Sequence, residues 1–196
     1  MLSDRFGDAL KFAEAAHRTQ RRKGTDIPYV AHLLAVAAIA LEHGGDEDQA
    51  IAALLHDAVE DQGGRAMEAR LRAGFGDRVA DIVMHCTDAE VVPKPPWRAR
   101  KEAYVAGLAH TPPEALLVSM ADKLHNAQSI LADHAEIGED LWARFKGGRD
   151  GTLWYYRALS DAYAARAPQG ATARLAARLA ATVAELEART GVAKGA

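Results

Sequence analysis

Apolar residues recur three or four positions apart at both ends of this chain, and this spacing constrains the fold more than any other feature. Near the start the repeating residues are Phe6, Leu10, Ala13 and Ala16, and near the end they are Leu175, Leu179, Val183 and Leu186. Such spacing places side chains on one face of an α-helix. We therefore predict a helix with one buried face at each end. The later stripe is expected to pack inside the protein, with a homodimer contact as the alternative.

The rest of the chain is also expected to be helical. Its composition, 49% hydrophobic and 26% charged, is ordinary for a globular protein, and the abundant Ala, Leu, Arg and Glu favour helix. Ser3 and Asp46 are expected to cap two helices, and Gly63 and Gly64 to end one. With 196 residues, the chain is long enough for one domain with its own core. We predict a compact, all-α, multi-helix fold in one domain spanning 1–196.

Two segments break the helical pattern. The stretch VVPKPPWRARK, over 91–101, holds three of the seven prolines, so we predict an extended loop that enters a helix at about residue 97. This basic loop, over 94–101, could close over a pyrophosphate group or be a solvated helix entrance. The stretch 132–151 is expected to be partly irregular.

Charge and cysteine content narrow the choice of partners. A net charge of −3 gives no general attraction to a polyanion, so nucleic-acid binding is not expected. The single Cys86 cannot form an internal disulfide, which agrees with a reducing compartment. The longest strongly apolar run, over 33–41, is much shorter than the roughly 20 residues that span a bilayer. We expect a cytoplasmic protein that does not enter a membrane.

The stretch ALLHDAVED, over 53–61, begins like a buried helix and then crowds four ionisable side chains together: His56, Asp57, Glu60 and Asp61. Buried carboxylates are costly unless they are paired, hydrogen-bonded or bound to a metal. Because residues four apart share a helix face, Glu60 lies one turn beyond His56, and Asp61 one turn beyond Asp57. Histidine and aspartate are suitable ligands for a divalent ion, but two ligands do not make a site.

Two other apolar stretches each contain one further candidate ligand. His32 stands between Ala31 and Leu33, and Asp122 stands in LLVSMADKL. A lone buried histidine is usually a hydrogen-bonded core residue, and a lone buried aspartate usually forms a salt bridge or caps a helix. Here the order His, His-Asp, Asp recurs across three apolar helices, and this order favours a shared metal site.

The segments HRTQRRKGTDIPYVAH, AALLHDAVED and MADKLHNA carry a family resemblance. With their spacings they resemble the HD superfamily of metal-dependent phosphohydrolases, and within it the hydrolase domain of RelA/SpoT-type enzymes, above all the small alarmone hydrolases. The resemblance covers most of 6–131, and the C-terminal helices over 151–190 would complete the domain. It implies an all-helical fold and one divalent metal ion, commonly Mn²⁺, held by His32, His56, Asp57 and Asp122.

The same resemblance implies roles for residues around the ion. Glu60 and Asp61 would orient a water molecule and accept its proton, because water beside a divalent ion is more acidic than bulk water. Arg22, Lys23 and Asn126 would contact a nucleotide substrate. Tyr155 stands outside this resemblance, in a run of three aromatic residues, and we expect its ring to contact the nucleotide, with a place in the core as the alternative.

The sequence also departs from the family pattern. Leu33 stands where proline is common, Gln128 stands where arginine is frequent, and the chain after about residue 132 matches poorly. The expected activity is hydrolysis of the 3′-pyrophosphate of guanosine tetra- or pentaphosphate. The alternatives are an HD phosphohydrolase for another nucleotide, such as an adenosine alarmone, and a non-catalytic, metal-stabilised nucleotide-binding regulator.

Overall fold

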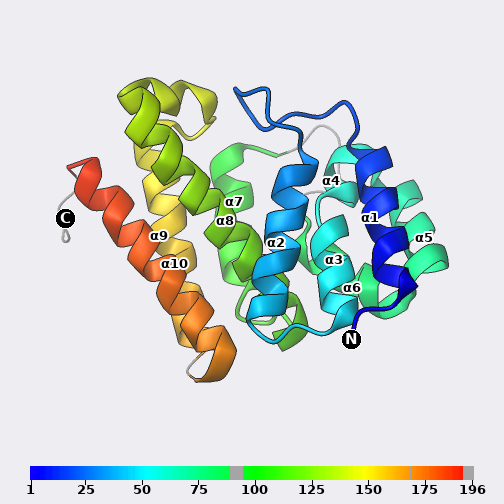
Figure 1. Cartoon of the computed structure of the whole chain (residues 1–196). Coiled ribbons are helices and arrows are strands. Elements are labelled where there is room, and N and C mark those ends of the chain that lie inside the picture. The colour runs from blue at the N-terminus through cyan, green and yellow to red at the C-terminus, as the bar shows by residue number, and fades with distance from the viewer. Residues whose placement is uncertain (89–94, 168, 192–196) are drawn as a thin grey trace. The chain divides into compact units, whose positions relative to one another are not determined.

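The computed structural model describes residues 1–88, 95–167 and 169–191 (Figure 1). Within these ranges the regular elements are helices, and the one β-type pairing is an isolated bridge between Arg21 and Pro28. The predicted all-α fold is therefore confirmed. No helix in the described part of the chain is long and apolar enough to cross a membrane.

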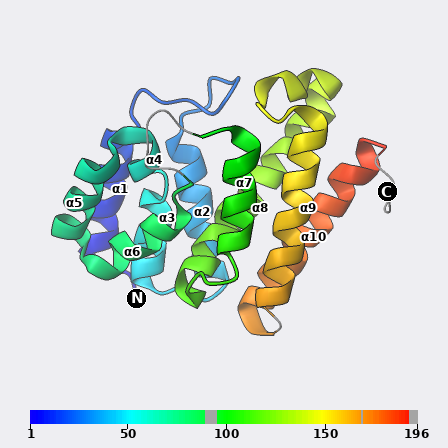
Figure 2. The same cartoon turned by 180° about the vertical axis from the view of Figure 1, so that it is seen from behind.

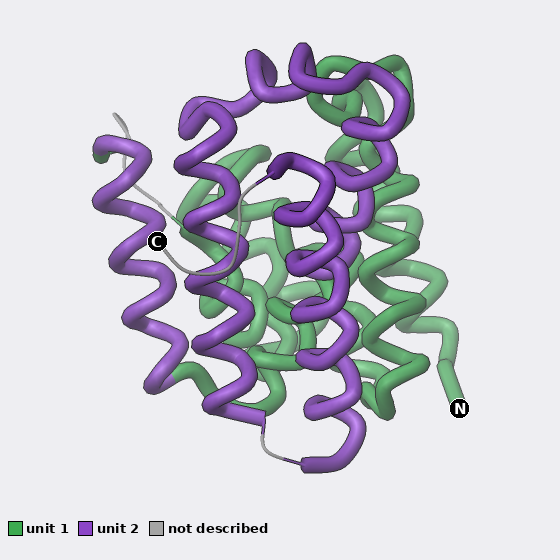
Figure 3. Tube along the Cα trace, turned by 90° about the vertical axis from the view of Figure 1, so that its left-hand side faces the viewer, with its two compact units in different colours: residues 1–95, 111–122 green, residues 96–110, 123–196 purple. Residues whose placement is uncertain are grey.

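The chain divides into two compact units, coloured separately in Figure 3. Unit 1 comprises Met1–Pro95 and Thr111–Asp122, and unit 2 comprises Pro96–His110 and Lys123–Ala196. One long helix, α8 (Pro113–Ile137), contributes its first part to unit 1 and its remainder to unit 2.

Unit 1 is built around a central helix, α3 (Glu47–Leu55), whose residues from Ala50 to Leu55 have no exposed surface. A helix that is apolar on every side has to be enclosed by others. The surrounding helices include α1 (Asp4–Ala16), α2 (Val30–Glu42) and α6 (Asp77–Cys86), which all pack on α3 (Figure 1). Two further helices complete the order, α4 (Ala58–Gln62) and α5 (Gly64–Phe75), and α5 packs on both α4 and α6.

Both predicted N-caps are confirmed. The Ser3 hydroxyl accepts a hydrogen bond from the Arg5 backbone N–H at the start of α1. At the start of α3, the Asp46 carboxylate accepts from the Gln49 N–H, and the Gln49 side chain accepts from the Asp46 N–H, each at 3.0 Å. This reciprocal pair satisfies donors that a helix N-terminus would otherwise leave open.

Unit 2 contains α7 (Trp97–Gly107), the rest of α8, the 3₁₀ segment η1 (Gly138–Arg144), α9 (Gly148–Arg166) and α10 (Gly170–Arg189). Helix α9 packs against α7 and α10 (Figure 2). The apolar stripe of α10 is buried: Leu175, Leu179, Val183 and Leu186 are each at most 2% exposed. The predicted packing face is thus confirmed, and contact between two copies of the chain stays a prediction.

The stretch 132–151 is more regular than its sequence suggests. Helix α8 continues to Ile137, η1 follows, and α9 begins at Gly148, so only residues 145–147 lack helical structure. Leu141 and Trp142 of η1 are buried. Their burial stabilises a helical form in a segment whose apolar residues lack a clear helical spacing. The predicted loop over 91–101 begins its helix at Trp97 as expected, but Lys94 and the rest of 89–94 lie outside the described residues.

Candidate active site

The motif ALLHDAVED does not form one unbroken helix. Helix α3 ends at Leu55, His56 and Asp57 form a turn, and α4 begins at Ala58. The backbone of Asp57 has φ −95° and ψ −4°, in the bridge region where many active-site residues lie. Adjacent side chains on a regular helix point about 100° apart. At this turn, both side chains instead reach the same cluster of polar atoms.

That cluster brings together the four residues predicted as metal ligands. His56 Nε2 lies 3.0 Å from Asp57 Oδ2 and 3.5 Å from Asp122 Oδ1. His32 Nε2, from α2, lies 3.2 Å from Asp122 Oδ1 and 3.6 Å from Asp57 Oδ2. Both histidines and Asp122 are buried, while Asp57 keeps part of its side chain accessible. All four belong to unit 1, and His32, His56 and Asp57 form a set whose ligand atoms lie within 4.8 Å of one another.

The hydrogen bonds of His56 test whether this cluster suits a cation. His56 Nδ1 lies 2.8 Å from the Ala53 carbonyl oxygen, which can only accept, so Nδ1 carries the hydrogen. In a neutral ring, Nε2 then presents a lone pair toward the carboxylates of Asp57 and Asp122. A lone pair facing carboxylate oxygens needs a proton or a metal ion between them. The donor set therefore fits a bound cation.

The electrostatics of the cluster lead to the same conclusion. Burial opposes a positive charge on His56, but the charges and hydrogen bonds of Asp57 and Asp122 raise its pKa well above the ordinary value. Conversely, burial would raise the pKa of Asp57, yet His56 and His32 lower it well below the ordinary range. The cluster thus stabilises positive charge between ionised carboxylates, as a divalent ion requires.

Tyr29 holds the Asp57 carboxylate from outside the cluster. Its hydroxyl donates to Asp57 Oδ2 at 2.6 Å. Burial and then the Asp57 charge raise the pKa of Tyr29 above its ordinary value, so the hydroxyl keeps its proton. Support of a ligand by a neighbouring group is a usual feature of metal sites. Residue type and spacing did not single out Tyr29, although it stands in one of the segments that carry the family resemblance.

The acidic pair after the turn lies in two different environments. Glu60 accepts a hydrogen bond from the Asp88 backbone N–H at 3.2 Å. Asp61 is exposed and accepts from the Gln20 side-chain amide at 2.8 Å. Partial desolvation and then the nearby Asp57 charge raise the pKa of Asp61. A carboxylate with a raised pKa is a better proton acceptor.

The turn over 18–28, which carries Arg21, Arg22 and Lys23, is folded back beside Asp61. The Arg21–Pro28 bridge closes the turn, and the Arg22 guanidinium carbon lies 5.7 Å from the centroid of the Tyr29 ring. Since Tyr29 contacts Asp57, the fold brings Arg22 to the neighbourhood of the cluster. Lys23, next in the chain, is exposed.

The other two predicted substrate contacts belong to unit 2. Tyr155 is 6% exposed and packs beside Trp97 and Trp154, with Lys101 Nζ 4.9 Å from its ring centroid. Asn126 lies on α8, one turn after Asp122. Their roles in substrate binding stay predictions.

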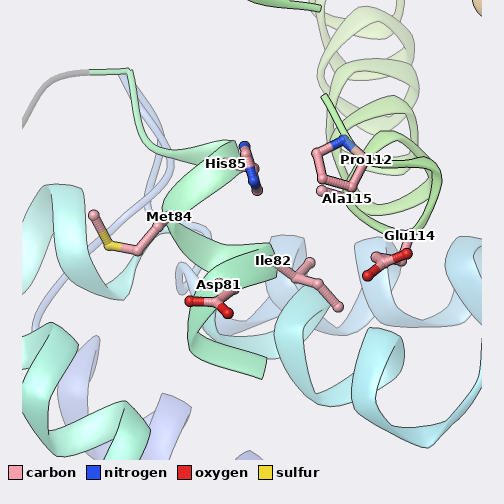
Figure 4. A pocket seen from close by; sticks show the side chains of 7 residues that line it. All are labelled: Asp81, Ile82, Met84, His85, Pro112, Glu114 and Ala115. Atoms are coloured by element: carbon pink, nitrogen blue, oxygen red, sulfur yellow. The ribbon is translucent and has the colours of Figure 1, made fainter. Parts of the chain in front are cut away.

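Unit 1 also has a cavity of about 260 Å³ elsewhere, between α6 and the start of α8. Figure 4 shows its lining side chains, which are Asp81, Ile82, Met84, His85, Pro112, Glu114 and Ala115. None of the predicted site residues is among them, so this cavity is not the candidate active site.

Comparison with known families shows which family the chain belongs to. Residues 9–153 match the family model of the HD domain. The chain belongs to the HD domain family. The match starts before His32 and ends after Asp122, so it includes all four residues of the cluster.

Relatives of this HD domain chain include proteins named as hydrolases. It is 40% identical over 126 residues to guanosine-3′,5′-bis(diphosphate) 3′-pyrophosphohydrolase MESH1 of Xenopus tropicalis, an alignment that covers 63% of this chain and 68% of that protein. A solved structure of a metazoan ortholog of SpoT that hydrolyzes ppGpp superposes with a TM-score of 0.75 and 26% identity, over 98% of this chain and 99% of that one. The crystal structure of lmo0812 from Listeria monocytogenes gives a TM-score of 0.70 and 30% identity, over 79% of this chain and 97% of that one. The resemblance to RelA/SpoT-type hydrolases is confirmed.

Proposed function

We propose that this chain is a metal-dependent hydrolase that removes the 3′-pyrophosphate of guanosine tetra- or pentaphosphate and releases GDP or GTP and pyrophosphate. The observation that carries the proposal is the convergence of His32, His56, Asp57 and Asp122, with 3.0 to 3.6 Å between histidine nitrogens and carboxylate oxygens. The names of the MESH1 relative and of the SpoT ortholog support the choice of substrate.

The four converging residues would hold one divalent ion. Two imidazole nitrogens and two carboxylate oxygens suit Mn²⁺, which we propose as the native metal. When bound, the ion supplies Lewis acidity toward the phosphoryl group and toward water. Restoring activity to metal-stripped protein with Mn²⁺, Mg²⁺, Fe²⁺ or Zn²⁺ in turn tests this choice. Higher activity with another ion would contradict it.

The chain's own residues would handle the water and the substrate. Glu60 and Asp61 would position the water and take its proton, so that its oxygen bonds to the 3′-phosphoryl phosphorus. The bond from that phosphorus to the ribose 3′ oxygen breaks, and the ribose oxygen gains a proton. Arg22 and Lys23 would offset the phosphate charges.

We propose that Asn126 and Tyr155 contact the nucleoside. The Asn126 amide offers a donor and an acceptor for the base or the ribose, and the Tyr155 ring offers an aromatic face. We also propose that 1–196 works as a single HD domain. The HD match over 9–153 extends across segments of both units, which supports this view.

The decisive experiment incubates metal-loaded protein with a nucleotide panel and follows pyrophosphate and phosphate release separately. Pyrophosphate from guanosine tetraphosphate is the expected result. Phosphate from another nucleotide would instead indicate a different HD phosphohydrolase, and tight binding without product would indicate a regulator.

Two substitutions separate metal binding from turnover. Asp57→Ala should abolish both, because it removes a ligand. Glu60→Ala should leave metal binding intact and lower turnover by about 10²- to 10⁴-fold, the usual contribution of a positioned acid or base. Glu185→Ala, on the exposed face of α10, removes the same kind of side chain and should change neither. Full turnover by the Glu60→Ala protein would refute the role of Glu60.

A further inference from the structure

We propose that Gln20 is a positioning residue that sets the direction of the Asp61 carboxylate, and that His17 and Gln62 hold the Gln20 amide in place. This inference rests on the proposed hydrolase function and adds to it a residue outside the predicted site. It is carried by a set of hydrogen bonds that joins the turn before α2 to helix α4.

The first step concerns which way the Gln20 amide faces. Its oxygen Oε1 lies 2.6 Å from Gln62 Nε2 and 2.7 Å from His17 Nδ1. Its nitrogen Nε2 lies 2.8 Å from Asp61 Oδ2. Turning the amide over would set its NH₂ against the Gln62 NH₂ and its oxygen against a carboxylate. The hydrogen-bond network therefore permits one orientation, with the N–H directed at Asp61.

The second step concerns how firmly Gln20 is held. Its backbone N–H donates to the His17 carbonyl at 2.9 Å, and its carbonyl accepts from the Tyr29 N–H at 3.1 Å. His17 is 2% exposed, and its ring stacks on the Tyr29 ring with 5.2 Å between centroids and 19° between planes. Both the backbone and the side chain of Gln20 are thus restrained before a substrate arrives, which lowers the entropy cost of placing its donor.

The third step concerns what Asp61 would do without this partner. It is exposed and stands near the end of a five-residue helix that stops at Gly63. An exposed carboxylate on so short a helix can rotate among its rotamers. The charge-assisted bond from Gln20 fixes one oxygen, so the proton acceptor of the proposed reaction keeps one direction.

A consequence is that one segment would serve both halves of the proposed reaction. The turn over 17–29 contains Arg22 and Lys23, which would meet the phosphates, and Gln20, which orients the acceptor of the water proton. Phosphate binding and placement of the base would then depend on the same piece of backbone.

The kinetic test uses two replacements of similar size. Gln20→Met keeps the volume but removes the amide, and Gln20→Glu keeps an oxygen for His17 and Gln62 but faces Asp61 with a second carboxylate. We expect kcat to fall about 10- to 100-fold in both, since small misplacements of a reacting group cost this much. KM and the dissociation constant of Mn²⁺, measured by calorimetry, should stay within about twofold of wild type, because neither depends on the direction of the base. Gln169→Glu, on the exposed N-cap of α10, makes the same charge change and should leave kcat unaltered.

A double-mutant cycle shows whether Gln20 acts through Asp61. In an Asp61→Ala background, adding Gln20→Met should cause no further loss of kcat. A loss as large as in the wild-type background would mean that Gln20 has a general structural role. A tenfold fall in Mn²⁺ affinity would mean that it acts through the ligands. Either result overturns the inference, and so does an unchanged kcat in the Gln20 variants.

A spectroscopic test needs no turnover. In metal-free, ¹⁵N-labelled protein, the side-chain amide signal that disappears in Gln20→Met should shift upfield in Asp61→Ala, as the carboxylate bond is lost. The Gln169 signal should not move. If wild type releases no pyrophosphate, the proposed function fails, whereas the Gln20–Asp61 pairing is decided by this signal alone. An unshifted Gln20 signal overturns the pairing even in an active enzyme.

Discussion

Replacing Tyr29 with phenylalanine tests how far the metal centre depends on support from outside its ligands. The substitution removes a single oxygen atom, which donates to Asp57 Oδ2 at 2.6 Å. The ring that stacks on His17 stays in place. We therefore expect the Tyr29→Phe protein to fold normally and to bind Mn²⁺ more weakly.

The size of the effect follows from the kind of hydrogen bond. A bond to a charged group contributes about 1.5 to 3 kcal/mol. Since each 1.4 kcal/mol is about a tenfold change in an equilibrium constant, the dissociation constant should rise roughly 10- to 100-fold. Tyr29 is only partly buried and water can replace some of the lost bond, so we expect a value near tenfold.

Calorimetric titration of Mn²⁺ into metal-free protein measures this change directly, and thermal unfolding of the same samples reports any loss of stability. Tyr163→Phe, in α9 of unit 2, removes the same atom from a buried tyrosine and should leave the affinity unaltered. A Tyr29→Phe protein that binds Mn²⁺ within twofold of wild type would refute the supporting role of the hydroxyl.

Four further predictions concern stability. Gly45→Ala should lower the free energy of unfolding by about 1 to 3 kcal/mol in a denaturant titration, because a Cβ there would lie 2.8 Å from the Ala40 carbonyl oxygen. By contrast, Gly74→Ala, in helix α5 with no atom within 4 Å of a Cβ, should raise it by up to about 1 kcal/mol. Leu179→Ala empties a fully buried position of α10 and should cost about 2 to 5 kcal/mol in the same titration. The Arg78 guanidinium lowers the pKa of Asp46, so the stability from this pair is present above about pH 4 and lost as pH falls through the lowered pKa. The free energies of unfolding of wild type and Arg78→Ala should differ by less than about 1 kcal/mol, because both groups are exposed. This difference should shrink in acid. A constant difference from pH 7 to pH 2 would contradict the role given to Arg78.

Much of the helical architecture follows from local sequence signals. The caps at Ser3 and Asp46 and the buried stripe of α10 could be predicted because capping and amphipathic spacing act within a few residues. The stretch 132–151 could not, because its helical form depends on burying Leu141 and Trp142 against other parts of the chain. The break at His56 and Asp57 also escaped prediction, since no glycine or proline marks it.

The candidate ligands His32, His56, Asp57 and Asp122 could be chosen from sequence because ionisable residues inside apolar helices are costly and rarely occur by chance in such an order. The residues that support the site could not. Gln20 and Tyr29 stand in or beside a polar turn, where no local pattern singles them out. Their partners are set by how that turn folds back on the 56–57 turn and on α4.

Residue order is thus enough to assign the fold class, because it depends on the spacing of apolar residues along helices. It is also enough to assign the family and the residues of the cluster, because the motifs that carry the resemblance are local stretches of sequence. The tertiary structure is needed to bring nitrogen and oxygen atoms to within 3.0 to 3.6 Å, to direct both neighbours at the 56–57 turn toward one cluster, and to give Asp57 and Asp61 their hydrogen-bond donors. These features depend on packing between segments that are distant in sequence, and no local pattern encodes them.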